Sequence, residues 1–307
     1  MADTMRERFT SVVGDLLDSD DRTVAVLAVI SHSLLAQAGI TARHPDRVID
    51  VGIREQAQIG VAGGLALEGF RPIVTGYAPF LVERTFEQVK LDFDHQGTSA
   101  ILASVGGTWD SAASGRTHQA PEDVSILASL RTWTVRVPGH PDELEAVLRR
   151  DHANGERAYL RMTNDANRRF QSPHPDRIAT VRQGSGEAPT VLGVGPVLDQ
   201  IVEATADLDV TVLYTATPFP IDAEGVRASA TGSDIAIIEP YLAGTSTVPV
   251  VEALSDRPMR FHAHGVRTVD THRFGTPDDH RRLHGLDAPG IRSWLDTVLP
   301  PRSPVLA

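Results

Sequence analysis

Hydrophobic residues in the first half of the chain fall into short runs separated by longer mixed stretches. The short runs predict strands at residues 24–30, 48–51, 72–76, 100–105, 134–137 and 158–161. The stretches between them predict helices at residues 55–67, 81–93, 121–130 and 141–151. Regular alternation of strands and helices predicts a mainly parallel sheet with helices on both faces.

The second half repeats this alternation after a polar interruption. Residues 164–189 are rich in proline, glycine and polar side chains, and we interpret residues 166–187 as a linker. Strands are predicted beyond it at residues 190–194, 210–214, 234–239 and 260–263, and helices at residues 197–208, 222–229, 244–254 and 288–299. The fold class is therefore α/β, with two doubly wound domains at residues 1–165 and 188–307.

Length and composition agree with this division into two domains and reduce the number of possible function classes. The chain has 307 residues, enough for two domains. Its net charge of -11 makes nucleic acid and anionic membranes poor partners. The absence of cysteine excludes disulfides and thiolate metal sites, and it fits a reducing compartment. No signal-peptide core or membrane-spanning run is found, so we expect a cytoplasmic protein.

An acidic residue opens the helix that follows the second predicted strand. Glu55 lies just beyond the carboxyl end of that strand, where parallel sheets collect ligands. The alternative is that its carboxylate only complements the helix dipole. The same helix contains Gly60, Gly63 and Gly64, which lower its stability and indicate close approach by another helix or another subunit.

Two further clusters follow later strands. Tyr77 and Phe80 flank a turn and could form a stacking platform or ordinary core. His118 lies in a polar loop, and histidine is the side chain that titrates near neutrality. A metal site formed with the nearby Glu122 and Asp123 is disfavoured because their spacing matches no familiar ligand pattern, so we predict no metal ligands in this chain.

Four segments together resemble the transketolase group of thiamine-diphosphate enzymes, over roughly residues 20–300. HPDRVIDVGIREQ (44–56) is similar to the family segment that delivers a cofactor-activating glutamate. GGLALEGFRPIVTGYAPFLVERTFEQV (63–89) is similar to the next strand and helix in transketolase and 1-deoxyxylulose-5-phosphate synthase. GRTHQAPED (115–123) resembles the DGxTHQ loop, and RFGTPDDHRRLHGLDAPGI (273–291) resembles the C-terminal ending of the family.

The resemblance implies a pyrimidine-binding domain followed by a transketolase C-terminal domain. The sequence contains no Gly-Asp-Gly motif, with which the family holds the cofactor diphosphate through Mg²⁺. We therefore expect one subunit of a split transketolase, active only with an N-terminal, diphosphate-binding partner, with two copies of each and self-association of this chain. The expected reaction is two-carbon ketol transfer from a ketose donor to an aldose acceptor.

Three alternatives remain open at this point. A beta-type subunit of a 2-oxo acid dehydrogenase or decarboxylase has the same two-domain architecture. An enzyme similar to 1-deoxyxylulose-5-phosphate synthase and a non-catalytic regulatory homologue are the others. The Thr-His-Gln loop and the C-terminal ending favour the transketolase reading, and the retained Glu55 argues against a non-catalytic copy.

The resemblance also assigns roles to individual residues. Glu55 matches the glutamate that hydrogen-bonds N1′ of the cofactor aminopyrimidine. Tyr77 and Phe80 match aromatic residues beside that ring, and His118 matches a histidine that faces the substrate. The resemblance then implies that the cofactor carries the carbanion chemistry, while the protein positions and tunes the cofactor.

The remaining assignments concern residues expected near the phosphate and the hydroxyl groups of the substrate. Arg161 matches a position where relatives use arginine towards a substrate phosphate. Trp109 stands where transketolases have a phosphate-binding histidine, and Ser114 stands where they have an aspartate that contacts sugar hydroxyls. These departures imply an unphosphorylated or unusual substrate.

Overall fold

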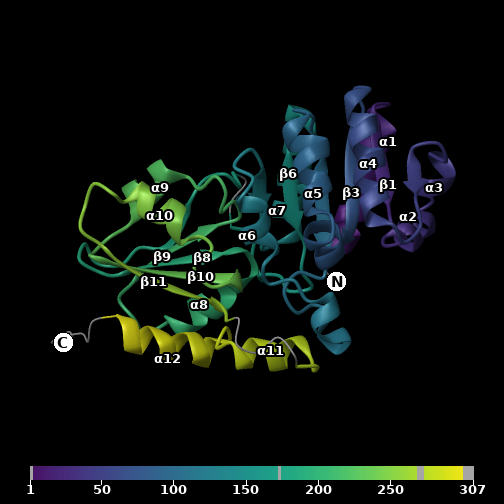
Figure 1. The fold of residues 1–307 in the computed structure, drawn as a ribbon. Helices are drawn as coiled ribbons and strands as arrows, with labels where there is room; N and C mark the ends of the chain where they lie inside the picture. Colours follow the sequence, from purple (N-terminus) through teal and green to yellow (C-terminus); the bar gives the residue numbers. More distant parts are fainter. Residues whose placement is uncertain (1–2, 172–173, 268–272, 300–307) are drawn as a thin grey trace.

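The computed structural model folds the chain into two α/β units, each built around its own sheet (Figure 1). It describes residues 3–171, 174–267 and 273–299. The outer ends of the two predicted domains, at 1–2 and 300–307, lie outside the described residues, as do positions 172–173 of the predicted linker.

The first sheet has six strands, all parallel, in the order β2-β1-β3-β4-β6-β5. Their bounds are β1 Thr23–Leu27, β2 Val48–Asp50, β3 Arg71–Tyr77, β4 Ile101–Val105, β5 Thr134–Arg136 and β6 Ala158–Arg161. The six strands predicted for the first domain are therefore confirmed. Their near-continuous apolar runs are explained by helices that cover both faces of the sheet.

Helices of the first unit pack on both faces of this sheet. The α-helices are α1 Met5–Ser19, α2 His32–Gln37, α3 Ile40–Arg43, α4 Glu55–Leu67, α5 Phe86–Gln88, α6 Asp123–Ala128 and α7 Pro141–Asn154. Two π-helical segments, η1 Pro79–Glu83 and η2 Val89–His95, and the 3₁₀ segment η3 Ala112–His118 complete the unit. The core on one face includes α1, α2 and α7, and the core on the other includes α4, η1, η2 and α6.

The continuous helix predicted at residues 81–93 is wrong. The structure has η1, the short α5 and η2 there instead. Between η1 and α5, the Thr85 hydroxyl donates a hydrogen bond of 2.6 Å to the Leu81 carbonyl. Such local side-chain bonds compete with the regular helix ladder and bend helices. The apolar periodicity that predicted the helix only requires Val89 and Phe93 to be buried, which π-helical turns also achieve.

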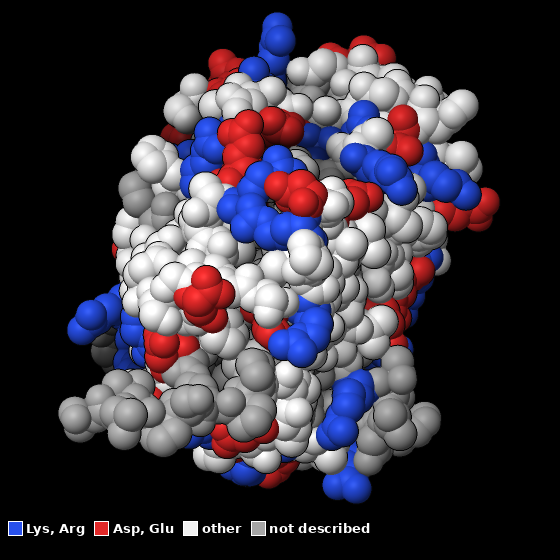
Figure 2. All heavy atoms as spheres, turned by 90° about the vertical axis from the view of Figure 1, so that its left-hand side faces the viewer, with Lys and Arg blue, Asp and Glu red and all other residues white. Residues whose placement is uncertain are grey.

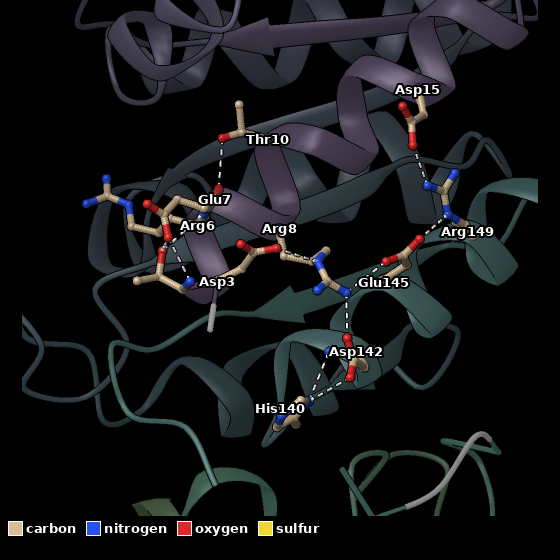
Figure 3. Close-up of polar contacts among 11 residues, drawn as sticks. Asp3, Arg6, Glu7, Arg8, Thr10, Asp15, His140, Asp142, Glu145 and Arg149 are labelled. Atoms are coloured by element: carbon tan, nitrogen blue, oxygen red, sulfur yellow. Dashed lines mark hydrogen bonds and ion pairs between the residues drawn. The ribbon is translucent and has the colours of Figure 1, made fainter. Parts of the chain in front are cut away.

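The sequence analysis did not predict α1. The buried residues on its inner face include Phe9, Val12 and Leu16. Arg8 ties the helix to α7, because its guanidinium pairs with Asp142 at 2.6 Å and with Glu145 at 2.9 Å (Figure 3). The helix is therefore an integral layer of the first unit rather than a loose N-terminal extension.

The second sheet has five strands in the order β11-β10-β8-β9-β7. The bounds are β7 Ala179–Arg182, β8 Thr190–Val194, β9 Thr211–Thr215, β10 Asp234–Leu242 and β11 Arg260–Val266. Its helices are η4 Gly195–Val197, α8 Leu198–Ala204, α9 Ala223–Ser229, α10 Thr247–Ala253, α11 Pro277–Leu283 and α12 Ala288–Val298. The cores put α8 and α12 on one face of this sheet and α9 and α10 on the other. The two-domain α/β fold class is confirmed.

One strand differs from the prediction. β7 lies inside the segment that we interpreted as a linker, and it pairs with β9 as the one antiparallel strand of the second sheet. It is a short edge strand with no fully buried residue, so it lacks the apolar run by which the other strands were found. The boundaries of the two domains themselves stay a prediction.

Backbone hydrogen bonds join the two units directly. The Val135 amide donates to the Phe219 carbonyl at 2.7 Å, and the Leu242 amide donates to the Pro121 carbonyl at 2.8 Å. In addition, the buried hydroxyl of Tyr214 donates to the Glu143 carboxylate. The second unit therefore contacts β5, α7 and the loop before α6 of the first unit.

Charged side chains are distributed without a single dominant sign on the face of the second unit that Figure 2 shows. Acidic and basic groups lie intermingled there, often in contact with each other. Across the described part of the chain, none of the helices combines the length and the apolarity that a membrane span requires.

Candidate active site

The carboxyl ends of β2, β3 and β4 bring the predicted site residues to one edge of the first sheet. Glu55 is the first residue of α4, five residues after the last residue of β2. Tyr77 ends β3, Phe80 lies in η1 directly after it, and His118 ends η3 after β4. Because parallel strands end at a common edge, three segments distant in sequence meet there, as expected for a ligand site.

The Glu55 carboxyl group is buried at the N-terminus of α4, with a side-chain exposure of 6%. Its Oε2 accepts a hydrogen bond of 2.7 Å from Nη1 of Arg84. Its Oε1 accepts none from the part of the chain that the structure describes. Because Oε1 has no such partner and is not fully enclosed by protein, a ligand at this edge of the sheet can donate or share a proton with it.

Three rings form a compact cluster beside Glu55. The centroid of the His118 ring lies 5.0 Å from that of Phe80 and 5.6 Å from that of Tyr77, and the two aromatic rings are 6.1 Å apart. All three contacts are edge-to-face, the geometry that ring quadrupoles favour. Arg84 links the cluster to Glu55, because its guanidinium carbon lies 4.2 Å from the centroid of Phe80.

Two buried features hold these side chains in place. Gln58 lies one turn after Glu55, and its amide donates to the Val26 carbonyl at 2.8 Å and to the Thr75 carbonyl at 2.9 Å. It thereby fixes α4 to β1 and β3. Gly106 has a φ of +74°, and a Cβ there would lie 2.5 Å from the Tyr77 ring. Only glycine fits this backbone and leaves room for the tyrosine.

Arg161 is not part of this cluster. Its side chain is fully buried and its Nε donates to Asp123 at 2.7 Å, with a further hydrogen bond to Thr108. The guanidinium is enclosed by protein in this conformation, and the expected contact with a substrate phosphate stays a prediction. The family position is kept, but here a buried ion pair under the site uses it.

Trp109 also lies apart from the three rings. It is 6% exposed, and its ring stacks at 5.5 Å on His284 and at 6.3 Å on His280, both from the second unit. The structure therefore gives Trp109 a packing role between the two units, and the expected substrate contact stays a prediction. The Trp109 side chain is part of the hydrophobic core that lies on the α8 and α12 face of the second sheet.

A polar pocket lies next to the three-ring cluster, and Tyr77 belongs to both. The cavity is about 200 Å³ in volume and is lined by Arg6, Tyr77, Val105, Gly106, Asp110, Ser111, Met162, Thr163 and Asn164. Burial raises the pKa of Asp110 to about 7, helped by the nearby Asp165 and opposed by the Asn164 amide, Arg161 and Arg6. Part of the carboxyl group still reaches solvent at the pocket.

Four residues of this region were not predicted from the sequence: Arg84, Gln58, Arg6 and Asp110. Arg84 lies inside the 63–89 segment that carried the family resemblance, so the sequence offered a reason to consider it near Glu55. Arg6 had no such signal, because α1 was not predicted. It reaches the carboxyl edge of the sheet through the packing of that helix on α7, α2 and β1.

Glu83 is the acidic residue next to Arg84, at the end of η1. Burial raises its pKa to about 7, against the attraction of Arg116 and with repulsion from Glu122 and Asp123. A raised carboxyl pKa means that the folded protein holds the proton more tightly than the unfolded chain. The stability from this group is therefore complete below its ordinary pKa of 4.5 and is lost as the pH rises through 7.

We accordingly expect Glu83→Gln to stabilise the protein at about pH 8 and to change little at about pH 5. The gain should be on the order of 1 kcal/mol after allowance for solvent screening, or roughly 2–4 °C in Tm. Thermal unfolding at the two pH values measures it, with the exposed neighbour Glu87→Gln as the charge-matched control. Equal Tm shifts at both pH values, or a stabilising control, would contradict the assignment.

The chain is similar in sequence to known proteins. Residues 2–168 match the family described as "Transketolase, pyrimidine binding domain". An uncharacterized 33.6 kDa protein in the fasciation locus of Rhodococcoides fascians is 41% identical over 295 residues, covering 95% of this chain and 93% of that protein. The 1-deoxy-D-xylulose-5-phosphate synthase 2 of Geobacter sulfurreducens is 32% identical over 317 residues, covering 94% of this chain and 49% of that enzyme.

Among solved structures, one described as "Split gene transketolase, inactive beta4 tetramer" has the same fold. It superposes with a TM-score of 0.83 at 23% identity, covering 97% of this chain and 99% of that one. Whereas this likeness extends along both chains, the present chain spans about half the length of the Geobacter synthase.

Fold and site together define an α/β protein with a buried carboxyl group and an aromatic cluster at the carboxyl edge of a pyrimidine-binding domain. The chain belongs to the transketolase family and corresponds to its C-terminal half. Membership implies that the protein serves a thiamine-diphosphate-dependent reaction.

Proposed function

We propose that this chain is the cofactor-activating subunit of a two-component, thiamine-diphosphate-dependent transketolase. It would support two-carbon ketol transfer from a ketose donor to an aldose acceptor. The observation that carries the proposal is the buried Glu55 carboxyl group, with one unpartnered oxygen, beside the ring cluster of Tyr77, Phe80 and His118.

Glu55 fits the aminopyrimidine of the cofactor. When bound, thiamine diphosphate supplies a thiazolium carbon that adds to a ketose carbonyl and stores the resulting negative charge. Glu55 shares a proton with N1′ of the pyrimidine through its free Oε1 and thereby favours the ring form that activates the thiazolium. Arg84 occupies Oε2 and keeps the carboxyl group oriented.

The ring cluster offers groups that can pack against the cofactor ring and contact the substrate. Tyr77 and Phe80 offer half-buried faces and edges on which a flat heterocycle can pack. His118 is partly exposed, and its Nδ1 is hydrogen-bonded to Thr117 at 2.9 Å, which leaves Nε2 for a substrate hydroxyl or carbonyl. It would thus act on the substrate rather than on cofactor activation.

The partner in this proposal is a separate subunit similar to the N-terminal half of transketolase. That subunit would hold Mg²⁺ and the cofactor diphosphate, and two copies of each chain would form a cytoplasmic heterotetramer. The similar structure of an inactive tetramer of beta chains from a split transketolase supports both the partner and self-association. The outward-facing Gly60, Val61 and Gly64 of α4 offer a close-packing surface, whereas Gly63 packs against Asp92 within the chain.

A second candidate is an enzyme similar to 1-deoxyxylulose-5-phosphate synthase, which joins the same cofactor to a 2-oxo acid. The 32% identity to such a synthase supports it, although that enzyme is about twice as long. Both reactions use Glu55 in the same way, so the site residues described above do not separate them.

A donor and acceptor screen of the reconstituted complex tests the proposal. We expect formation of a ketose lengthened by two carbons, detected by mass spectrometry, from a ketose donor and an aldose acceptor. Carbon dioxide release from a 2-oxo acid without any activity on ketose donors would favour the second candidate. Failure of every donor to react would overturn both.

A further inference from the structure

The polar pocket beside Tyr77 is the most informative feature that the proposed reaction does not yet use. It opens between the ends of β3, β4 and β6, and its wall includes the same tyrosine that contacts His118. Whatever reacts near the ring cluster can therefore extend into this pocket. Its volume of about 200 Å³ would hold about six waters, or the end of a short polyol.

Two opposite charges face this pocket. Arg6 projects from α1, on the opposite side of the helix from the Arg8 network that ties α1 to α7 (Figure 3). In the described residues, the Arg6 guanidinium has no hydrogen bond or ion pair, and its Nε is buried. Asp110 contributes the negative group, with Oδ2 bonded to the Asn164 amide at 2.9 Å and Oδ1 free of such a bond.

The other nearby charges are already engaged. Arg161 pairs with Asp123 through its Nε and does not line the pocket, although its buried Nη1 has no hydrogen-bond partner within the described residues. Arg281 holds Asp165 through two bonds of 2.6 and 2.8 Å. A phosphate dianion in this pocket would meet one free guanidinium and one carboxylate. An uncharged polyol end would instead donate a hydroxyl proton to Asp110 Oδ1 and accept a hydrogen bond from Arg6, which satisfies both groups.

We propose that Asp110 is a specificity-determining residue that makes this pocket select the uncharged, hydroxyl-bearing end of a sugar and exclude a phosphorylated one. The inference rests on the proposed function for the class of substrate, which is a sugar. The exclusion of phosphate by the Asp110 carboxylate does not depend on that function and can be tested separately. Discrimination arises through repulsion as much as through new contacts.

A binding experiment on the full chain tests this without catalysis. Inorganic phosphate is titrated at about pH 8 and followed by ³¹P NMR line broadening. We expect no site-specific binding to the wild type, at least about tenfold tighter binding to Asp110→Asn, and loss of that gain in Arg6→Gln/Asp110→Asn. Asp21→Asn, which removes the same charge at the opposite edge of the sheet, is the control and should resemble the wild type.

Either of two results would overturn the proposal. One is Arg6-dependent phosphate binding by the wild type that is as tight as that of Asp110→Asn. The other is the absence of binding to both, which would mean that the Asp110 charge is not what excludes phosphate.

A second readout applies to the reconstituted complex. The ratio of kcat/KM for a phosphorylated aldose to that for its unphosphorylated counterpart should rise about tenfold or more in Asp110→Asn and stay constant in Asp21→Asn. A merely structural role would lower both values together and leave the ratio unchanged, which would also contradict the proposal. If the complex turns over no sugar at all, the proposed function fails, while the phosphate titration still decides the role of Asp110.

Discussion

Purified alone and supplied with thiamine diphosphate and Mg²⁺, the chain is expected to transfer no ketol group above background. Addition of a partner similar to the N-terminal half of transketolase should restore turnover. The reason is that the chain provides groups for the pyrimidine end of the cofactor, whereas its sequence has no Gly-Asp-Gly segment for the diphosphate end. A cofactor held at one end only is not positioned against the substrate, and positioning supplies much of the rate in such reactions.

The measurement is product formation by each subunit alone and by an equimolar mixture, at one fixed cofactor concentration. A partner preparation without this chain is the matched control and should also be inactive. Turnover by this chain alone, at a rate near that of the mixture, would contradict the split assignment.

Replacement of Glu55 by Gln in the complex should lower kcat by about 10²–10⁴-fold, the usual contribution of a group that handles a proton. Gln can still accept the hydrogen bond from Arg84, so the local structure and the affinity for the cofactor should change little. Steady-state kinetics and a cofactor titration measure the two quantities separately. Glu87→Gln, an exposed change in the same half of the chain, should leave both unchanged.

His118→Ala should lower turnover for a different reason. The ring lies in the cluster with Tyr77 and Phe80, and its hydrogen bond within the described residues is to Thr117 rather than to Glu55, so cofactor activation should stay near the wild-type rate. Loss of a substrate contact should appear in kcat/KM for the sugar. Measurement of both rates in one variant checks the assignment, and equal loss of activation and turnover would speak against it.

Glu55, Tyr77, Phe80 and His118 could be brought together from the sequence for a simple geometric reason. Each follows a strand of one parallel sheet, and the carboxyl ends of such strands share an edge. The strands themselves were predictable because burial on both faces produces short, continuous apolar runs. The alternation of strands and helices was then enough to assign the fold class.

Arg161 and Trp109 could not be placed in this way. Arg161 is enclosed by Asp123 and Thr108, which lie 38 and 53 residues away in the sequence. The histidines that stack on Trp109 come from the second unit, about 170 residues further along the chain. Arg6 depends on α1, whose charged first turn concealed its apolar face. Side chains that depend on contacts distant in sequence carry no local signal, even when their own strand or loop is correctly predicted.

Exchange of the C2 hydrogen of thiamine diphosphate for deuterium tests the central claim most directly. It reports activation of the cofactor before any substrate is involved, so it does not depend on the identity of the sugar. The account predicts rapid exchange in the wild-type complex, near-normal exchange with His118→Ala, and exchange about 10²–10⁴-fold slower with Glu55→Gln. Exchange as fast with Glu55→Gln as with the wild type would contradict the role of Glu55, and with it the proposed function of the chain.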